Sequence, residues 1–164
     1  MTTATVRDAE VGDAEAIMAL YNHEVLTGTA TFDLETRSLD AQIEWIEEHQ
    51  RANPAVVAEL DSVVVGFASL SPFKTRAAYR TTVENSIYVA ELAQGRGIGR
   101  LLLSAIVERA RMAGFHTIIA RIGGDNPASM ALHESLGYTV VGIERQVGRK
   151  FGRWLDCTEM QLML

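Results

Sequence analysis

The sequence predicts one α/β domain in which helices pack on a mixed, mostly antiparallel β-sheet. The length of 164 residues fits a single domain, residues 1–164. Strand-like and helix-like segments follow one another with no linker, repeat or charge block between them. One strand–helix–strand unit, residues 82–122, requires a crossover and therefore a parallel strand pair, whereas the adjacent strands before it favour antiparallel pairing.

The first half of the chain contains two amphipathic helices and two strands. A short strand is expected at residues 5–7, and apolar residues at helical spacing predict a helix over residues 13–26. A second helix covers residues 39–51, with Ser38 as its N-cap, and Pro54 ends it. Two β-rich segments, residues 55–60 and 63–71, flank Asp61-Ser62, which is typical of a hairpin turn.

The second half alternates strands and helices before a final strand pair. Asn126 and Pro127 are suited to the N-cap and the first position of the last helix. The expected elements are a strand at 82–89, a helix from the glycine-rich turn to about Gly114, a strand at 117–122, a helix ending at Gly137, and strands at 138–144 and 154–164 joined by a loop at 145–153.

Composition narrows the functional classes. The formal net charge of −6 disfavours general nucleic-acid binding, which depends on neutralising phosphates. A single cysteine, Cys157, permits neither an intramolecular disulfide nor a cysteine-based zinc site, and no histidine pair has metal-ligand spacing, so no metal is expected. The first ten residues lack an apolar signal-peptide core, and the longest apolar stretch is too short to span a bilayer. We therefore expect a cytoplasmic enzyme or ligand-binding module.

A glycine-rich turn, Gln94-Gly95-Arg96-Gly97-Ile98-Gly99-Arg100, lies between a predicted strand and a predicted helix. Glycines allow close approach of a ligand, and a helix start offers free N–H groups to a phosphate. The turn lacks the Lys-Ser/Thr of a Walker A loop, and its glycine spacing differs from the dinucleotide fingerprint. It fits the acyl-CoA pyrophosphate turn, Gln/Arg-x-x-Gly-x-Gly/Ala; a strand–helix loop without a ligand is the alternative.

Together with this turn, four further segments extend the pattern over essentially the whole chain: YNHEV at 21–25, TVENSIYV at 82–89, NPASMALHESLGY at 126–138 and KFGRWLD at 150–156. With them the sequence resembles the GNAT superfamily of N-acetyltransferases, in particular the phosphinothricin and methionine sulfone/sulfoximine acetyltransferase group. The resemblance implies a sheet of about seven strands with one splayed strand pair, about four flanking helices, and a homodimer.

The resemblance also implies acetyl-CoA as cosubstrate. Its pantetheine arm would lie between the splayed strands, and its pyrophosphate would lie on the glycine-rich turn. The implied contacts are the main chain of Ile87, Tyr88 and Val89, the turn residues Gln94, Gly95, Arg96, Gly97, Ile98, Gly99 and Arg100, and, farther along, Asn126 and Ser135.

Two residues are candidates for proton transfer. Glu84 is a charged residue in an apolar, β-branched strand, and the resemblance places it at the general base; a solvated surface glutamate is the alternative. His133 titrates near neutrality and is the candidate acid for the leaving thiolate, where most of the superfamily has tyrosine. A packed helix histidine with a local hydrogen bond is its alternative.

The acceptor pocket is expected to contain Phe32, Lys74, Arg76 and Tyr79 beside Glu84. Lys74 and Arg76 form a basic island that suits an anionic amino acid, although a solubilising loop and plain core packing are the alternatives. This pair resembles the phosphinothricin enzymes, whereas residues 147–156 resemble the methionine sulfone enzymes.

The sequence therefore predicts acetylation of the α-amino group of phosphinothricin, methionine sulfoximine or methionine sulfone. Another small amine, a protein N-terminus, or a non-catalytic acyl-CoA sensor are the alternatives.

Overall fold

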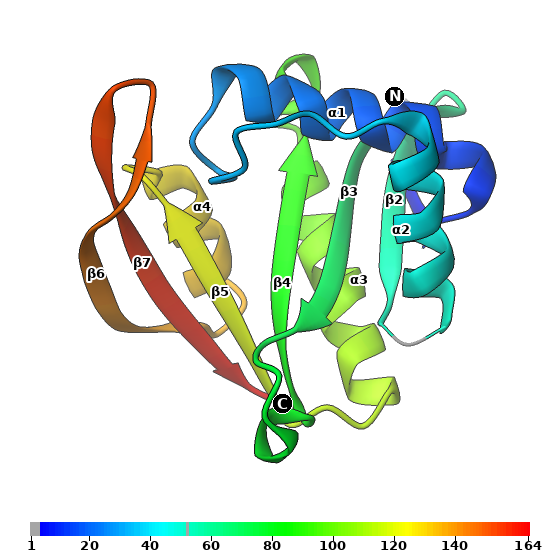
Figure 1. Ribbon diagram of the computed structural model, residues 1–164. Coiled ribbons are helices and arrows are strands. Elements are labelled where there is room, and N and C mark those ends of the chain that lie inside the picture. Colours follow the sequence, from blue (N-terminus) through cyan, green and yellow to red (C-terminus); the bar gives the residue numbers. More distant parts are fainter. Residues whose placement is uncertain (1–3, 52) are drawn as a thin grey trace.

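The computed structural model describes residues 4–51 and 53–164, in which a seven-stranded sheet has the order β1-β2-β3-β4-β5-β7-β6 (Figure 1). Neighbouring strands are antiparallel except β4 and β5, which are parallel, so the predicted mixed sheet is confirmed. The strands are β1 Thr5–Asp8, β2 Ala55–Leu60, β3 Val63–Pro72, β4 Thr82–Val89, β5 Thr117–Gly123, β6 Thr139–Lys150 and β7 Arg153–Met163.

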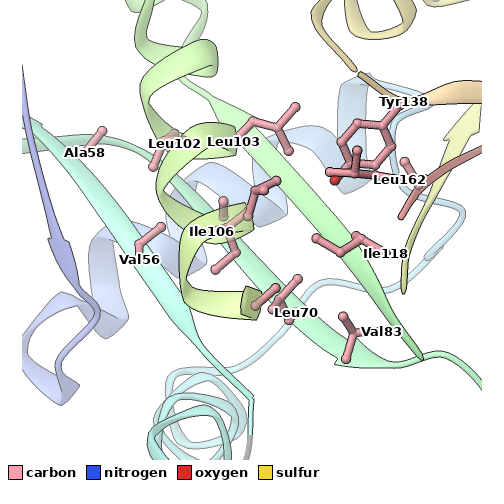
Figure 2. Close-up of a cluster of buried hydrophobic side chains, with 14 of the residues drawn as sticks. Val56, Ala58, Leu70, Val83, Leu102, Leu103, Ile106, Ile118, Tyr138 and Leu162 are labelled. Carbon is pink, nitrogen blue, oxygen red and sulfur yellow. The ribbon is translucent and has the colours of Figure 1, made fainter. Parts of the chain in front are cut away.

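Four α-helices cover the two faces of the sheet, as predicted: α1 Ala14–Thr27, α2 Leu39–Arg51, α3 Ile98–Met112 and α4 Pro127–Glu134. Strand alternation separates two cores. Val56 and Ala58 of β2 pack with α3, whereas Ala55 and Val57 pack with α1 and α2. Figure 2 shows the α3 core, in which Ile106 lies against side chains of the central strands. Burial on both faces makes β2 nearly continuously apolar.

The sheet opens between β4 and β5. Only four residue pairs join them, from Thr82 with Thr117 to Asn85 with Ala120. Beyond Asn85, β4 remains paired with β3 as far as Val89, while β5 pairs with β7 (Figure 1). The predicted splayed strand pair is therefore confirmed, and from residue 86 onward the main chain of β4 has no strand on its β5 side.

The last strand pair corrects the sequence prediction. Residues 145–153 are not a loop, because β6 runs to Lys150 and turns tightly at Phe151-Gly152, both with positive φ (50° and 72°). The strand predicted at residues 138–144 is the first half of β6. Register shifts at residues 140–142 and 144–148 disturb the alternation and almost all of β6 is exposed, so the pattern of its second half does not indicate a strand. The last helix also ends earlier than predicted, at Glu134. The Asp61-Ser62 hairpin turn is confirmed, with φ of 49° and 64°.

Candidate active site

The glycine-rich turn provides an anion-binding helix start. Gly95 and Gly97 have φ of 71° and 79°, a conformation that L side chains disfavour, and no neighbouring atom lies within 4 Å of where a Cβ would stand on either. Gly97 is the N-cap of α3 and, being glycine, has no side chain that could accept from the N–H groups of the first turn. The N–H groups of that turn therefore remain available to an anionic ligand.

A groove of about 800 Å³ extends from this turn along the open edge of β4. Ile87, Tyr88 and Val89 line its wall, and Gln94, Gly95 and Gly99 line the end near the turn. Asn126 lines the opposite side and caps α4 by accepting a hydrogen bond from Ser129 N at 3.0 Å, as predicted for an N-cap. Ile98, the first residue of α3, is buried and does not line the groove. The groove thus extends from the start of α3 along the unpaired edge of β4, between main-chain polar groups at both places.

A hydrogen bond between Arg100 and Ser135 joins the start of α3 to the end of α4. Arg100 Nη1 donates to Ser135 Oγ at 2.8 Å, and Ser135 Oγ donates to Leu132 O at 2.7 Å. Arg96, in the turn, is exposed. The structure thus places these three predicted residues around the same turn, with Arg100 and Ser135 in contact.

Glu84 lines a second pocket, of about 230 Å³, on the face of the sheet that α1 and α2 cover. Its side chain is half-buried and, within the described residues, has no hydrogen bond or ion pair. Burial raises the pKa of the Glu84 carboxyl above its usual range, and the nearby charge of Arg121 partly opposes that rise. A carboxylate with a raised pKa and a free lone pair is suited to accept a proton.

A small cavity of about 50 Å³ connects the groove with the Glu84 pocket. It shares Ser86 and Gly123 with the pocket, and Ile87 and Asn126 with the groove, while Tyr88 lines all three. Beside β4, three adjoining cavities, here called the path, therefore lie in a row between the glycine-rich turn and Glu84.

His133 lies beneath this path and is buried. Its Nδ1 is 2.7 Å from Ser129 O, so Nδ1 carries the proton, and its Nε2 accepts from Asn85 Nδ2 at 3.0 Å. Tyr138 donates in turn to Asn85 Oδ1 at 3.1 Å. Burial lowers the pKa of His133, which keeps the ring neutral at pH 7. Both ring nitrogens are thus engaged within the protein, and the proton-donor role stays a prediction.

Phe32 lines the Glu84 pocket, as expected. Its ring packs against two glycines: a Cβ on Gly123 or Gly148 would lie within 2.5 Å of a ring carbon. Only glycine therefore fits at these positions of β5 and β6 without moving the ring.

Lys74, Arg76 and Tyr79 lie apart from this pocket. They belong to the segment between β3 and β4, where the Lys74 ammonium stands over the rings of Phe73 (4.6 Å) and Tyr79 (5.2 Å). All three are exposed, and none lines the pocket as the described residues of one chain form it. Their predicted role in acceptor binding is not tested by this arrangement.

Two arginines that the sequence analysis did not select line the pocket instead: Arg37 and Arg121. Arg121 is an isolated charge in the apolar strand β5 and forms an ion pair with Glu144. The argument that selected Glu84, a charge in an apolar strand, would have selected Arg121 too. Arg37 lies in an irregular segment and gives no such signal.

Two negative findings concern the described residues, 4–51 and 53–164. No helix among them is long and apolar enough to cross a membrane, and no three His, Cys, Asp or Glu side chains gather as metal ligands would.

Comparison with known proteins defines the class. Residues 6–158 match the acetyltransferase (GNAT) domain, so the chain belongs to the GNAT family of acetyltransferases. It is 44% identical to the L-methionine sulfoximine/L-methionine sulfone acetyltransferase of Salmonella typhimurium, over 98% of this chain and 94% of the relative.

Solved structures agree with this assignment. A GNAT superfamily phosphinothricin acetyltransferase from Sinorhizobium meliloti, in complex with acetyl-CoA, superimposes with a TM-score of 0.94 at 41% identity and covers 99% of this chain and 89% of its own. A ribosomal-protein-alanine N-acetyltransferase from Brucella melitensis gives 0.95 at 42% identity, covering 98% and 99%. The predicted family and fold are thus confirmed.

Proposed function

We propose that the protein transfers the acetyl group of acetyl-CoA to the α-amino group of a small anionic amino-acid analogue: methionine sulfone, methionine sulfoximine or phosphinothricin. The observation that supports this proposal is the path of adjoining cavities beside β4. It leads from the glycine-rich helix start to a pocket whose carboxylate, Glu84, has no hydrogen bond or ion pair among the described residues. The names of the relatives support the acceptor class.

Acetyl-CoA supplies an acetyl thioester at the open edge of β4. The main chain of Ile87, Tyr88 and Val89 would hold the pantetheine arm, because that edge has no strand on its β5 side. The N–H groups from Gly95 to Arg100 would hold the pyrophosphate at the start of α3. Gln94, Asn126 and Ser135 would contact the cosubstrate along the same groove.

Glu84 would make the acceptor nucleophilic. An α-amino group is protonated near neutral pH and must lose a proton before it attacks a carbonyl carbon. Glu84 lies in the pocket next to the path and can accept that proton directly or through one water molecule. The N–C bond then forms, the C–S bond breaks, and the sulfur leaves as a thiolate that takes up a proton. His133 is the candidate donor for that proton. Because the proton of its neutral ring is on Nδ1, donation would require that the hydrogen bond to Ser129 O opens.

A second candidate acceptor is a protein N-terminus, because the Brucella structure bears the name of an enzyme for ribosomal-protein alanine. A peptide acceptor has an amide where a free amino acid has its carboxylate. The two acceptors therefore differ in the charge next to the reacting amine.

We also propose a cytoplasmic homodimer. Acetyl-CoA is a polyanion that does not cross membranes unaided, so an enzyme that uses it works where it is made. The β6–β7 hairpin exposes an apolar surface, here named the hairpin face, that suits a second copy of the chain. Its residues are Val140, Val141, Ile143, Val147, Phe151 and Trp154.

Release of free thiol from acetyl-CoA tests the function. The panel contains methionine sulfone, methionine sulfoximine, phosphinothricin, methionine, spermidine and an N-terminal alanine peptide, with an acceptor-free control because Cys157 lies in the pocket. Selective turnover of the first three supports the proposal. Turnover of the peptide alone would favour the second candidate, and acetyl-CoA binding without any turnover would favour a sensor.

A further inference from the structure

Arg37 occupies the side of the acceptor pocket formed by α1 and α2, whereas Glu84 occupies the floor formed by the sheet. Within the described residues, its guanidinium has no Asp or Glu within ion-pair distance. Arg121, the other arginine of the pocket, is bound to Glu144. Arg37 is thus the cation of this pocket whose charge no carboxylate neutralises.

Several contacts fix Arg37 in place. Asn22 on α1 brackets its main chain: Asn22 Nδ2 donates to Arg37 O at 2.9 Å, and Arg37 N donates to Asn22 Oδ1 at 2.8 Å. The guanidinium stands 3.8 Å from the ring centre of Tyr21 and 5.4 Å from that of Trp45. Cation–π contacts of this kind hold a guanidinium without neutralising its charge.

Gln42 on α2 also contacts Arg37, although burying the Gln42 side chain costs stability. Its side chain is fully buried, and Oε1 accepts a hydrogen bond from Arg37 Nη1 at 3.3 Å. Its Nε2 is buried and has no hydrogen-bond partner in the part of the chain that the structure describes. A buried amide that is half unsatisfied destabilises a fold, so an apolar residue would serve packing better. The hydrogen bond to Arg37 explains why a glutamine occupies this buried position.

We propose that Arg37 binds the carboxylate of the acceptor, and that Gln42 is a positioning residue for it. This inference rests on the proposed function and deepens it. A fixed guanidinium can bind a carboxylate through two parallel N–H donors. With its carboxylate at Arg37, an α-amino acid directs its amine toward Glu84. The pocket therefore selects acceptors with a free carboxylate over their neutral amides, and it would disfavour a peptide N-terminus.

The test compares methionine sulfone with its carboxamide, which lacks the charge. Arg37→Gln should raise KM for methionine sulfone about 10- to 100-fold, the size of a charged hydrogen bond, and leave KM for the carboxamide within about twofold. Because the two amines differ in intrinsic pKa, each acceptor is compared with itself across variants. Arg111→Gln, on the exposed side of α3, is the matched control.

Gln42→Glu gives a second, nearly isosteric test. A carboxylate at this position keeps the hydrogen bond to Arg37 but neutralises its charge. KM for methionine sulfone should rise as in Arg37→Gln, with the carboxamide again unaffected. Gln42→Leu should leave thermal stability unchanged or higher while KM rises, a combination that a purely structural role would not produce.

Calorimetric binding of both compounds in the presence of CoA separates this inference from the proposed function. Preference for methionine sulfone in the wild type that is lost in Arg37→Gln supports the anion site even if no transfer occurs. Equal losses for the two compounds, no loss for either, or no binding of methionine sulfone to the wild type would each overturn it. Failure of the proposed function alone would appear as binding without thiol release.

Discussion

The ammonium of Lys150 donates a hydrogen bond of 2.9 Å to the main-chain oxygen of Thr31. Lys150 is only 3% exposed, and its other polar neighbour is Glu24 O at 3.4 Å, also a main-chain oxygen. Thr31 and Phe32 line the acceptor pocket, whereas Lys150 ends β6. This contact therefore ties the β6–β7 hairpin to the segment that encloses the acceptor.

We expect Lys150→Met to loosen that segment. Methionine fills a similar volume but leaves the oxygen of Thr31 without the Lys150 donor, at a cost of about 1–3 kcal/mol, whereas Glu24 O keeps its bond from Gly28 N at 2.9 Å. KM for the acceptor should rise several-fold, more than KM for acetyl-CoA does. Steady-state kinetics with both substrates varied give this comparison. Lys150→Arg, which retains a donor, should be less impaired; equal KM changes for the two substrates would argue against the tie.

Glu84→Gln should lower kcat by about 100-fold or more, the usual contribution of a general base. Acetyl-CoA affinity should not change, because Glu84 does not line the groove. In the wild type, kcat/KM should rise with pH through the raised pKa of Glu84, and this limb should disappear in the variant. Calorimetry and a pH–rate profile provide the measurements. An unchanged kcat in Glu84→Gln would show that Glu84 is not the general base.

His133→Phe distinguishes a structural role of His133, through its hydrogen bonds to Asn85 and Ser129, from a role as proton donor. The ring can keep its edge-to-face contact with Tyr138, at 4.9 Å between centroids, but Asn85 Nδ2 loses its acceptor. We expect the free energy of unfolding to fall by about 1–3 kcal/mol and kcat to fall less than about tenfold. Urea unfolding and initial rates measure the two quantities. A 100-fold loss of kcat at unchanged stability would instead identify His133 as the acid.

The stability of the protein should fall as the pH drops below about 6.5, the ordinary histidine pKa. Burial lowers the pKa of His133 and of His49, so the unfolded chain binds more protons than the folded one in this range, and acidification favours unfolding. The raised pKa of Glu84 acts in the opposite direction at lower pH. Thermal unfolding between pH 7.5 and 5.5 measures the slope.

His49→Phe tests how much His49 contributes to this dependence of stability on pH. The His49 ring stacks on Trp45 at 3.8 Å between centroids, a contact that phenylalanine can keep, and its Nε2 is buried with no hydrogen-bond partner among the described residues. The variant should show a shallower loss of Tm on acidification. An unchanged slope would mean that other groups dominate.

The hairpin face gives a prediction about assembly. Trp154 is 60% exposed there, with Arg149 5.3 Å above its ring. Trp154→Asp should shift the mass measured by light scattering from two chains to one, because it places a charge in a contact that would be apolar. A wild-type mass of one chain would contradict the proposed dimer directly.

Local patterns in the sequence were enough to predict most of the fold. The β2–β3 hairpin turn and the Asn126 cap each depend on residues close together in the chain. The parallel β4–β5 pair follows from the crossover that a strand–helix–strand unit requires. The far end of β6 could not be predicted, because its register shifts and exposure remove the alternation that marks a strand.

The site was predictable to a different degree. Glu84 and Phe32 line the same pocket as expected. Arg37 was missed because its position depends on contacts with Asn22 and Gln42, which the fold brings together from two helices. Conversely, the basic pair Lys74 and Arg76 is visible in the sequence as a cluster of charge. Such a cluster does not show whether the loop that carries it lies next to the pocket, and in the structure neither residue lines the pocket.

The splayed strands also affect how the whole molecule resists unfolding. Only four residue pairs hold β1–β4 to β5–β7 within the sheet, so the two halves share a narrow seam. A molecule bound along the open edge of β4 would contact both halves of the sheet and add interactions between them. At 100 times its Kd, such a ligand adds about 2.7 kcal/mol to the free energy of unfolding. Hydrogen exchange of the amides along β4 and β5 should therefore slow as acetyl-CoA is added to the protein.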